Sequence, residues 1–297
     1  MAFAQRPKFL WQLRSRSLAL GERTLVMGVV NVTPDSFSDG NRYFDAQAAI
    51  ARALELLDEG ADLLDIGGES TRPGRYAPVA AEEEQRRVLP VIAAVMRERP
   101  EAVLSIETYT ASTARIAVEA GAAIVNDISA FTWDEEMASA CAGMGCGVVL
   151  MHTRGKPSEW RGLPALAHEE VLPLVLSGLG AGLQRALDAG VDRQRIALDP
   201  GYGFGKSFDE NYPLLARQSE LLELSQPLLV GVSRKSFLGR KLADLHGGAD
   251  APMAERGNAT VAAVTAAILG GAHIVRVHDV RAAMEAARIA DAVLAAS

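Results

Sequence analysis

Hydrophobic positions along the chain follow two alternating patterns. Short runs rich in Val, Ile and Leu are separated by longer segments of Ala, Leu, Glu and Arg whose apolar residues recur with helical periodicity. Short runs that are apolar throughout are typical of parallel strands buried on both faces. The eight strand candidates are TLVMGVVN, DLLDIGG, AVLSIET, AIVNDIS, GVVLMHT, RIALDPG, PLLVGVS and HIVRVHD.

The segments between these runs read as helices. Examples are DAQAAIARALELLDEG, AAEEEQRRVLPVIAAVMRER, TASTARIAVEAG and VRAAMEAARIADAVLAA. Several such segments end at a glycine, as at Gly60, Gly121 and Gly190, which is the usual chemistry of a helix C-terminus. Eight strand-then-helix units with apolar strands predict an α/β fold, a parallel (β/α)8 barrel, in preference to a doubly wound open sheet.

A barrel of this kind uses the whole chain as a single domain, residues 1–297. Residues 24–297 would form the barrel, and residues 1–23 would be an N-terminal extension. We expect that extension to be a short hairpin closing the bottom of the barrel.

Polar or ionisable residues stand at almost every predicted strand end. Catalytic groups of such barrels lie where strands end and the following loops begin. Taken singly, these residues have simpler readings: Asn126 could cap a helix, and Asp199 before Pro200 could belong to a turn. Their recurrence favours one shared pocket. The positions are Asn31, Asp65, Glu107, Asn126, Met151, His152, Asp199, Ser233 to Lys235, Arg276 and His278.

Two loops after early strands have the composition of ligand-binding segments. NVTPDSFSDG (31–40) is too rich in Pro, Asp, Ser and Gly for regular structure, and it could cover a site. GGESTRPG (67–74) combines a two-glycine turn with hydroxyl groups and Arg72, which suits an anion or a carboxylate.

Later motifs point to an anionic ligand. DPGYGFGKS (199–207) is neither a P-loop nor a dinucleotide fingerprint, because its glycines have the wrong spacing. GVSRKSFLG (231–239) and RVHDV (276–280) follow the last two strands, the usual phosphate side of such barrels. Arg276 and His278 are two residues apart in a strand and project to the same face. With Lys235 nearby, they favour an anionic leaving group or ligand.

Charge and composition restrict the partners. A net charge of -7 gives no general attraction to nucleic acid or anionic membranes, so a small-molecule partner is expected. Cys141 and Cys146 are too widely spaced for a CxxC motif and are expected to be buried free thiols. Arg14 and Arg16 interrupt any signal-peptide core, and the run VLPLVLSGLGAGL is shorter than the roughly 18 residues of a membrane helix. A soluble, cytoplasmic protein is expected.

Seven motifs together resemble those of the dihydropteroate synthases, a TIM-barrel family of folate biosynthesis. The resemblance extends from about Thr24 to the last helix. It implies a transferase that joins p-aminobenzoate to (7,8-dihydropterin-6-yl)methyl diphosphate, with Mg²⁺ as a helper, and a homodimer packed through the last helices. The motifs are NVTPDSFSDG, DIGGESTRPG, VNDIS, LMH, DPGYGFGK, LLVGVSRKSFLG and GAHIVRVHDV.

The resemblance also implies roles for individual residues. Asn31 would ligate the magnesium ion on the diphosphate, with Asp35 nearby. The implied catalytic residues are Lys235, Arg276, Glu107 and Asp35. The implied pterin contacts are Glu107, Asn126, Asp199, Lys235, Met151 and Phe204. The implied p-aminobenzoate contacts are Thr71, Arg72, Pro73, Phe37, Lys235 and Ser236. The implied diphosphate contacts are Asn31, Thr71, Arg72, Arg276, Val277 and His278.

One position departs from the family pattern. Where the family typically has S-(I/V)-D-T, this chain has SIET, so Glu107 replaces an aspartate and moves the carboxylate outward by more than about 1 Å. Tyr109 and Thr110 could accommodate the change. Two other functions stay open: a pterin-binding paralogue without synthase activity, for which Glu107 is the only support, and a pterin-dependent methyltransferase, which would not need STRPG or SRKSFLG.

Overall fold

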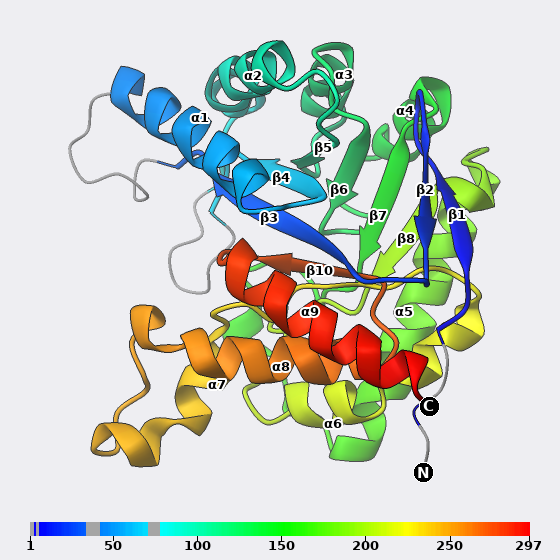
Figure 1. Cartoon of the computed structure of the whole chain (residues 1–297). Helices are drawn as coiled ribbons and strands as arrows, with labels where there is room; N and C mark the ends of the chain where they lie inside the picture. The colour runs from blue at the N-terminus through cyan, green and yellow to red at the C-terminus, as the bar shows by residue number, and fades with distance from the viewer. Residues whose placement is uncertain (1–2, 4–5, 34–41, 71–77) are drawn as a thin grey trace.

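The computed structural model describes residue 3 and residues 6–33, 42–70 and 78–297. Its central feature is a sheet of eight parallel strands, in the order β8-β7-β6-β5-β4-β3-β10-β9 (Figure 1). A bridge between Leu198 and Leu228 joins the two edges, so the predicted barrel is confirmed. The strands are β3 (Leu25–Asn31), β4 (Leu63–Gly67), β5 (Leu104–Glu107), β6 (Ile124–Asp127), β7 (Gly147–Met151), β8 (Ile196–Asp199), β9 (Leu229–Val230) and β10 (Ile274–Val277).

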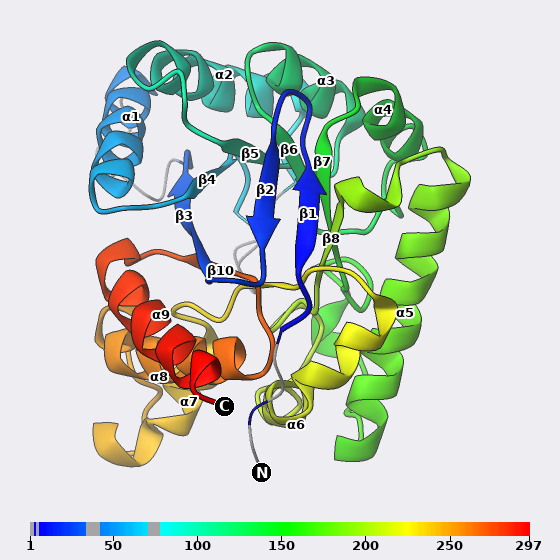
Figure 2. The same ribbon diagram turned by 45° about the vertical axis from the view of Figure 1, so that its right-hand side comes forward.

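Helices surround the strands (Figure 2). Those of the described chain are α1 (Arg42–Asp58), α2 (Ala81–Glu98), α3 (Ala111–Glu119), α4 (Met137–Met144), α5 (His168–Asp188), α6 (Asn211–Ala216), α7 (Ser236–Lys241), α8 (Gly257–Leu269) and α9 (Val280–Ala295). Short 3-10 turns cover Trp160–Gly162, Arg193–Arg195, Gln218–Leu224, Ala243–His246 and Met253–Glu255. Gly60, Gly121 and Gly190 have φ of 104°, 124° and 90°, which confirms the predicted left-handed helix ends.

Strand β9 is shorter than its sequence predicts. Of the run PLLVGVS, only Leu229 and Val230 pair as a strand. Pro227 has no N–H to donate to a ladder, and the chain turns at Arg234, where φ is 56°. The short strand brings Ser233 to Lys235 to the mouth of the barrel as a turn, where they line the cavity described below.

The N-terminal extension forms the expected hairpin. β1 (Phe9–Gln12) pairs antiparallel with β2 (Ser17–Leu20). Trp11, Leu13 and Leu20 are buried against the side chains at the amino ends of the barrel strands, such as Met27 and Ile274. The hairpin therefore closes the bottom of the barrel.

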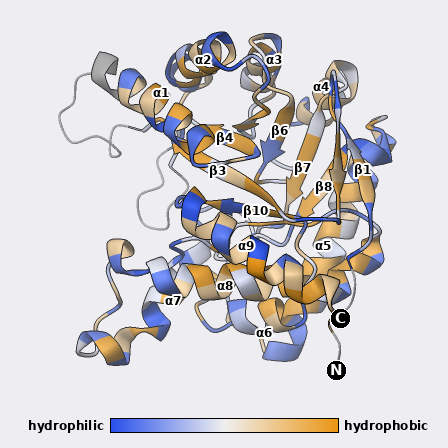
Figure 3. Ribbon diagram, viewed as in Figure 1, coloured by the Kyte–Doolittle hydropathy of each residue, from blue (hydrophilic) through white to orange (hydrophobic). Residues whose placement is uncertain are grey.

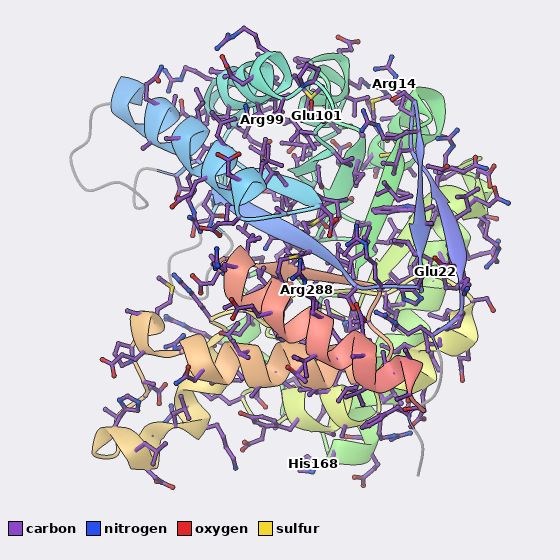
Figure 4. All side chains as sticks on the ribbon, viewed as in Figure 1. Arg14, Glu22, Arg99, Glu101, His168 and Arg288 are labelled. Atoms are coloured by element: carbon purple, nitrogen blue, oxygen red, sulfur yellow. The ribbon has the colours of Figure 1, made fainter. Side chains whose placement is uncertain are left out.

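Polar contacts fasten both ends of the hairpin. Arg14 lies at its tip (Figure 4) and donates to the carbonyl of Val118 over 3.1 Å. Just before the hairpin, Arg6 forms a buried ion pair with Asp291 of α9 at 2.6 Å. These contacts join the extension to elements far away in the sequence.

His273 predicts a pH dependence of stability. Its Nδ1 accepts from the N–H of Leu228 (3.1 Å), its Nε2 contacts the carbonyl of Pro7 (3.0 Å), and burial lowers its pKa to about 4. The ring therefore stays neutral in the fold, while the unfolded chain takes up a proton as the pH falls through about 6.5. We expect this group to lower the free energy of unfolding by about 2 kcal/mol between pH 7.5 and pH 5.

Urea unfolding of the wild type and of His273→Gln at both pH values measures this effect. The variant should lose that part of the pH dependence, and an identical pH dependence in the two proteins would contradict the assignment. Removal of the exposed His168 of α5 (Figure 4), as His168→Gln, is the matched control.

Two further expectations concern the chain as a whole. Cys141 and Cys146 are buried and free, as predicted. None of the helices in the described residues is both long enough and apolar enough to span a bilayer.

Candidate functional site

The carboxyl ends of the strands surround a cavity of about 280 Å³. Strand ends and the loops after them line most of it, as the barrel geometry predicts. Twelve of the residues predicted for the site lie in its wall. They are Asn31, Glu107, Asn126, Met151, Asp199, Phe204, Ser233, Arg234, Lys235, Ser236, Arg276 and His278.

One predicted contact residue turns its side chain away from this wall. Val277 is a correction: its side chain is 1% exposed and belongs to the hydrophobic core. Strand residues alternate between faces, so Arg276 and His278 point to the cavity and Val277 points away from it. The remaining predicted residues, Asp35, Phe37, Thr71, Arg72 and Pro73, lie outside the described residues.

Arg276 is held by two carboxylates from neighbouring strands. Its Nε donates to Oδ2 of Asp65 over 2.6 Å, and its terminal nitrogen donates to Oε2 of Glu107. Burial acts to lower the pKa of Arg276, but the two carboxylates raise it overall. Burial raises the pKa of Glu107, and Arg276 opposes that shift. The result is a positive charge at the end of β10 whose position is fixed from two sides.

Glu107 lies opposite Gly67 in the β4–β5 ladder, and a Cβ atom on Gly67 would lie 3.5 Å from Oε1 of Glu107, an ordinary van der Waals contact. The hydroxyl of Tyr109, expected to accommodate Glu107, instead donates to Glu69 with 3.0 Å to each oxygen, and its ring packs edge-on against Trp133. Thr110 bonds through its N–H to the hydroxyl of Thr108.

Asp199 and Lys235 also lie in the cavity wall. Oδ1 of Asp199 accepts from the N–H of Gly201 at 2.7 Å, and burial raises the pKa of this carboxyl. The ammonium of Lys235 lies 4.1 Å from the ring centre of Phe204, and burial lowers its pKa to about 8. A flat ligand in this region would meet an acceptor, a cation and an aromatic ring.

Lys206 joins the loops that follow β7 and β8. Its buried ammonium donates to the carbonyl of Gly201 at 2.8 Å and lies 3.0 Å from Nδ1 of His152. Burial lowers the pKa of His152 well below its usual range and that of Lys206 to about 7. His152, at a predicted strand end, is thus behind the cavity wall and supports the loop that carries Asp199 and Phe204.

Two polar contacts connect the ends of β9 and β10. The hydroxyl of Ser233 lies 3.0 Å from Nδ1 of His278 and accepts from the main-chain N–H of that residue. Arg234 forms a two-point ion pair with Asp279, at 3.1 and 2.5 Å. We interpret the serine as a group that orients the imidazole.

Several residues of the wall were not predicted as site residues. Trp160 packs edge-on against Phe204 with ring centres 5.3 Å apart, and Met253 and Arg256 come from the segment before α8. None of these three stands at a strand end, so no strand-based argument selects them. Glu69, also in the wall, belongs to the motif GGESTRPG.

Comparisons with known proteins agree with this geometry. The family model described as pterin binding enzyme matches residues 27–278. Dihydropteroate synthase of Bacillus subtilis is 42% identical over 278 residues, 94% of this chain and 91% of that protein. The structure of Xanthomonas albilineans dihydropteroate synthase with 4-aminobenzoic acid has a TM-score of 0.85 and 40% identity, over 98% of this chain and 99% of the other. That of Yersinia pestis dihydropteroate synthase with a sulfonamide drug has a TM-score of 0.87 and 38% identity, over 97% and 100%.

Proposed function

The chain belongs to the family of pterin-binding enzymes, and from this we propose that it is a dihydropteroate synthase of folate biosynthesis. It condenses (7,8-dihydropterin-6-yl)methyl diphosphate with p-aminobenzoate to give 7,8-dihydropteroate and diphosphate. The observation that carries the proposal is that the cavity wall holds two kinds of polar group. Asn126 and Asp199 offer hydrogen-bond acceptors for a ring edge rich in N–H donors, whereas Arg276 and His278 offer donors for an anionic tail.

The pterin end uses buried acceptors. A pterin presents a guanidine-like edge with several N–H donors, and a carboxylate such as that of Asp199 accepts from them more strongly than a neutral group does. Met151 and Phe204 supply apolar contacts to the ring. The cation of Lys235 lies above the ring of Phe204. From there it can contact the pterin ring and its bridging methylene from one side.

The diphosphate end uses positive charge. Arg276 and His278 would bind the leaving group and stabilise the charge that develops on it. The main-chain atoms of Val277 are the part of that residue available for such a contact, since its side chain is in the core.

Asn31 is suited to a magnesium ion bound with the diphosphate. It ends β3 and lines the cavity, and its amide oxygen is a hard ligand of the kind that Mg²⁺ accepts. No group of three or more His, Cys, Asp or Glu residues within the described ranges could hold a metal ion. A single protein ligand such as Asn31 fits an ion whose other ligands are mainly diphosphate oxygens and water. When bound, the ion would neutralise part of the charge on the leaving group.

The bond to be broken is the one between the pterin methylene and the diphosphate oxygen. The family resemblance implies that this bond breaks first and leaves a pterin cation, which the aniline nitrogen then attacks. Glu107 is in the cavity wall as a carboxylate that can stabilise such a cation. Ser236 and Lys235, with the predicted Phe37, Thr71, Arg72 and Pro73, would bind the p-aminobenzoate. Asp35 remains a predicted catalytic residue.

Sulfonamide binding and assembly are also part of the proposal. A sulfonamide is bound by the Yersinia pestis relative, so we expect such drugs to compete with p-aminobenzoate here. A homodimer through the last helices is supported by α8, which is apolar along most of its length (Figure 3), and by Ile289 of α9, which is 69% exposed. We also propose that the protein is cytoplasmic.

A coupled diphosphate-release assay tests the activity. Purified protein with Mg²⁺ and the pterin diphosphate should release diphosphate when p-aminobenzoate is added, and 7,8-dihydropteroate should accumulate in equal amount. Pterin binding without turnover would support the paralogue without synthase activity. Transfer of a methyl group from a methylated pterin, with no pteroate formed, would support the methyltransferase.

A further inference from the structure

Asp65 is a buried carboxylate that touches two residues of the cavity wall but does not line the cavity itself. It stands in the middle of β4 and is 0% exposed. Its Oδ2 accepts from Nε of Arg276 at 2.6 Å and from Nδ2 of Asn126 at 3.0 Å. One oxygen atom thus connects a residue proposed for the diphosphate with a residue proposed for the pterin.

The contact with Asp65 determines which way the amide of Asn126 points. A carboxylate oxygen that pairs with an arginine accepts hydrogen bonds, and the amide presents its NH2 group to that oxygen of Asp65. Its carbonyl oxygen, Oδ1, is then directed away from Asp65. This oxygen is buried and has no hydrogen-bond partner among the described residues, although Asn126 lines the cavity. A buried acceptor without a partner destabilises the fold unless a ligand donates to it.

We propose that Asp65 is a positioning residue that keeps Asn126 in the acceptor orientation and thereby makes the cavity selective for a ring edge that carries N–H donors. The inference rests on the proposed function, because the donor-bearing edge is that of the pterin. It adds a residue that does not contact substrate and acts through Asn126. The same oxygen holds Arg276, so Asp65 fixes both ends of the substrate relative to each other.

A purely structural role for Asp65 predicts different geometry. A carboxylate that served only to neutralise Arg276 would be expected to form a two-point ion pair with it, as Asp279 does with Arg234. Here Arg276 donates to Asp65 through Nε and to Glu107 through a terminal nitrogen. Asp65 accepts a further hydrogen bond from the amide of Asn126. The arrangement orients Asn126 in addition to balancing charge.

The test compares two ligands of the same shape. In 6-hydroxymethylpterin position 2 carries an amino group, whereas in 6-hydroxymethyllumazine it carries an oxygen, so a donor becomes an acceptor. Titration calorimetry gives the ratio of the two dissociation constants for the wild type, Asp65→Ala, Asp65→Leu and Asp65→Asn. The control is Ser105→Ala, since Ser105 is equally buried and stands opposite Asp65 in the β4–β5 ladder.

Asp65→Ala and Asp65→Leu remove the acceptor, so the amide of Asn126 is free to turn and donate. We expect the wild type to prefer the pterin, and the preference to fall about 10-fold or more in both of these variants, because a site built to accept a hydrogen bond rejects the wrong group strongly. Asp65→Asn can keep its carbonyl oxygen at the position of Oδ2, where it accepts from both Arg276 and Asn126, and should retain most of the preference. Ser105→Ala should keep the wild-type ratio. Asp65→Leu fills more of the space left by the carboxylate and carries the test if Asp65→Ala does not fold.

Three other outcomes are informative. An equal loss of affinity for both ligands would show that Asp65 is only structural and would overturn the inference while the proposed function stands. An unchanged ratio in Asp65→Ala or Asp65→Leu would overturn it in the same way. A wild-type protein with no preference for the pterin would instead contradict the proposed function, and the inference with it.

Discussion

Replacement of Glu107 by glutamine should lower kcat by about 10²-fold and change the KM for p-aminobenzoate little. The carboxylate ends β5 in the cavity wall and shares Arg276 with Asp65. A neutral amide of the same shape keeps the volume but cannot stabilise a pterin cation. The substitution also removes the ion pair between Arg276 and position 107 and keeps the one with Asp65. Steady-state kinetics with both substrates measures the effect.

A matched control is the buried carboxyl of Glu84. It lies on α2, accepts from the hydroxyl of Thr108 at 3.1 Å, and has its pKa raised to about 7 by burial. It is not part of the cavity wall, so Glu84→Gln should keep kcat within a few-fold of the wild type. Near-normal turnover in Glu107→Gln would show that the carboxylate at position 107 is not catalytic.

Replacement of Asp199 by asparagine should weaken the binding of 6-hydroxymethylpterin by about 10²-fold, with a much smaller effect on p-aminobenzoate. The N–H of Gly201 donates to one oxygen of Asp199 over 2.7 Å. An asparagine would have to place its carbonyl oxygen there, which turns its NH2 group toward the cavity. Donors on the protein would then face donors on the pterin, and the negative charge would also be lost.

Calorimetric titration with 6-hydroxymethylpterin measures this loss. Asp192→Asn is the control, because Asp192 also accepts from a main-chain N–H two residues later (2.9 Å to Gln194) but lies on the surface. Wild-type affinity in Asp199→Asn would show that the carboxylate does not meet the pterin.

The fold could be predicted from the sequence because its signal is local and repeated. Eight apolar runs alternate with helical periodicity, and strand-ending residues of a barrel meet at one rim. The strand ends also predicted that Glu107, Asn126, Asp199 and Arg276 share one wall, as they do. Val277 was implied by the family motif instead, and its side chain lies in the core, since a motif names consecutive residues whereas a strand turns them to opposite faces.

Other parts of the site depend on contacts between distant segments. Neither Met253 nor Arg256 stands near a strand end, and only the folding of the segment before α8 brings them to the cavity. Glu107 contacts Arg276, which lies far away in the sequence, whereas Tyr109, the neighbour that sequence position suggested for it, donates to Glu69. The structure gives no explanation for Glu in place of Asp at this position.

A crystal structure of the protein with Mg²⁺, diphosphate and 6-hydroxymethylpterin tests the assignment of the cavity most directly. The account predicts that the aminopyrimidine edge meets Oδ1 of Asn126 and the carboxylate of Asp199. It also predicts the diphosphate against Arg276 and His278, with the ion on Asn31. A pterin bound with its donor edge toward Arg276, or outside this cavity, would contradict the account.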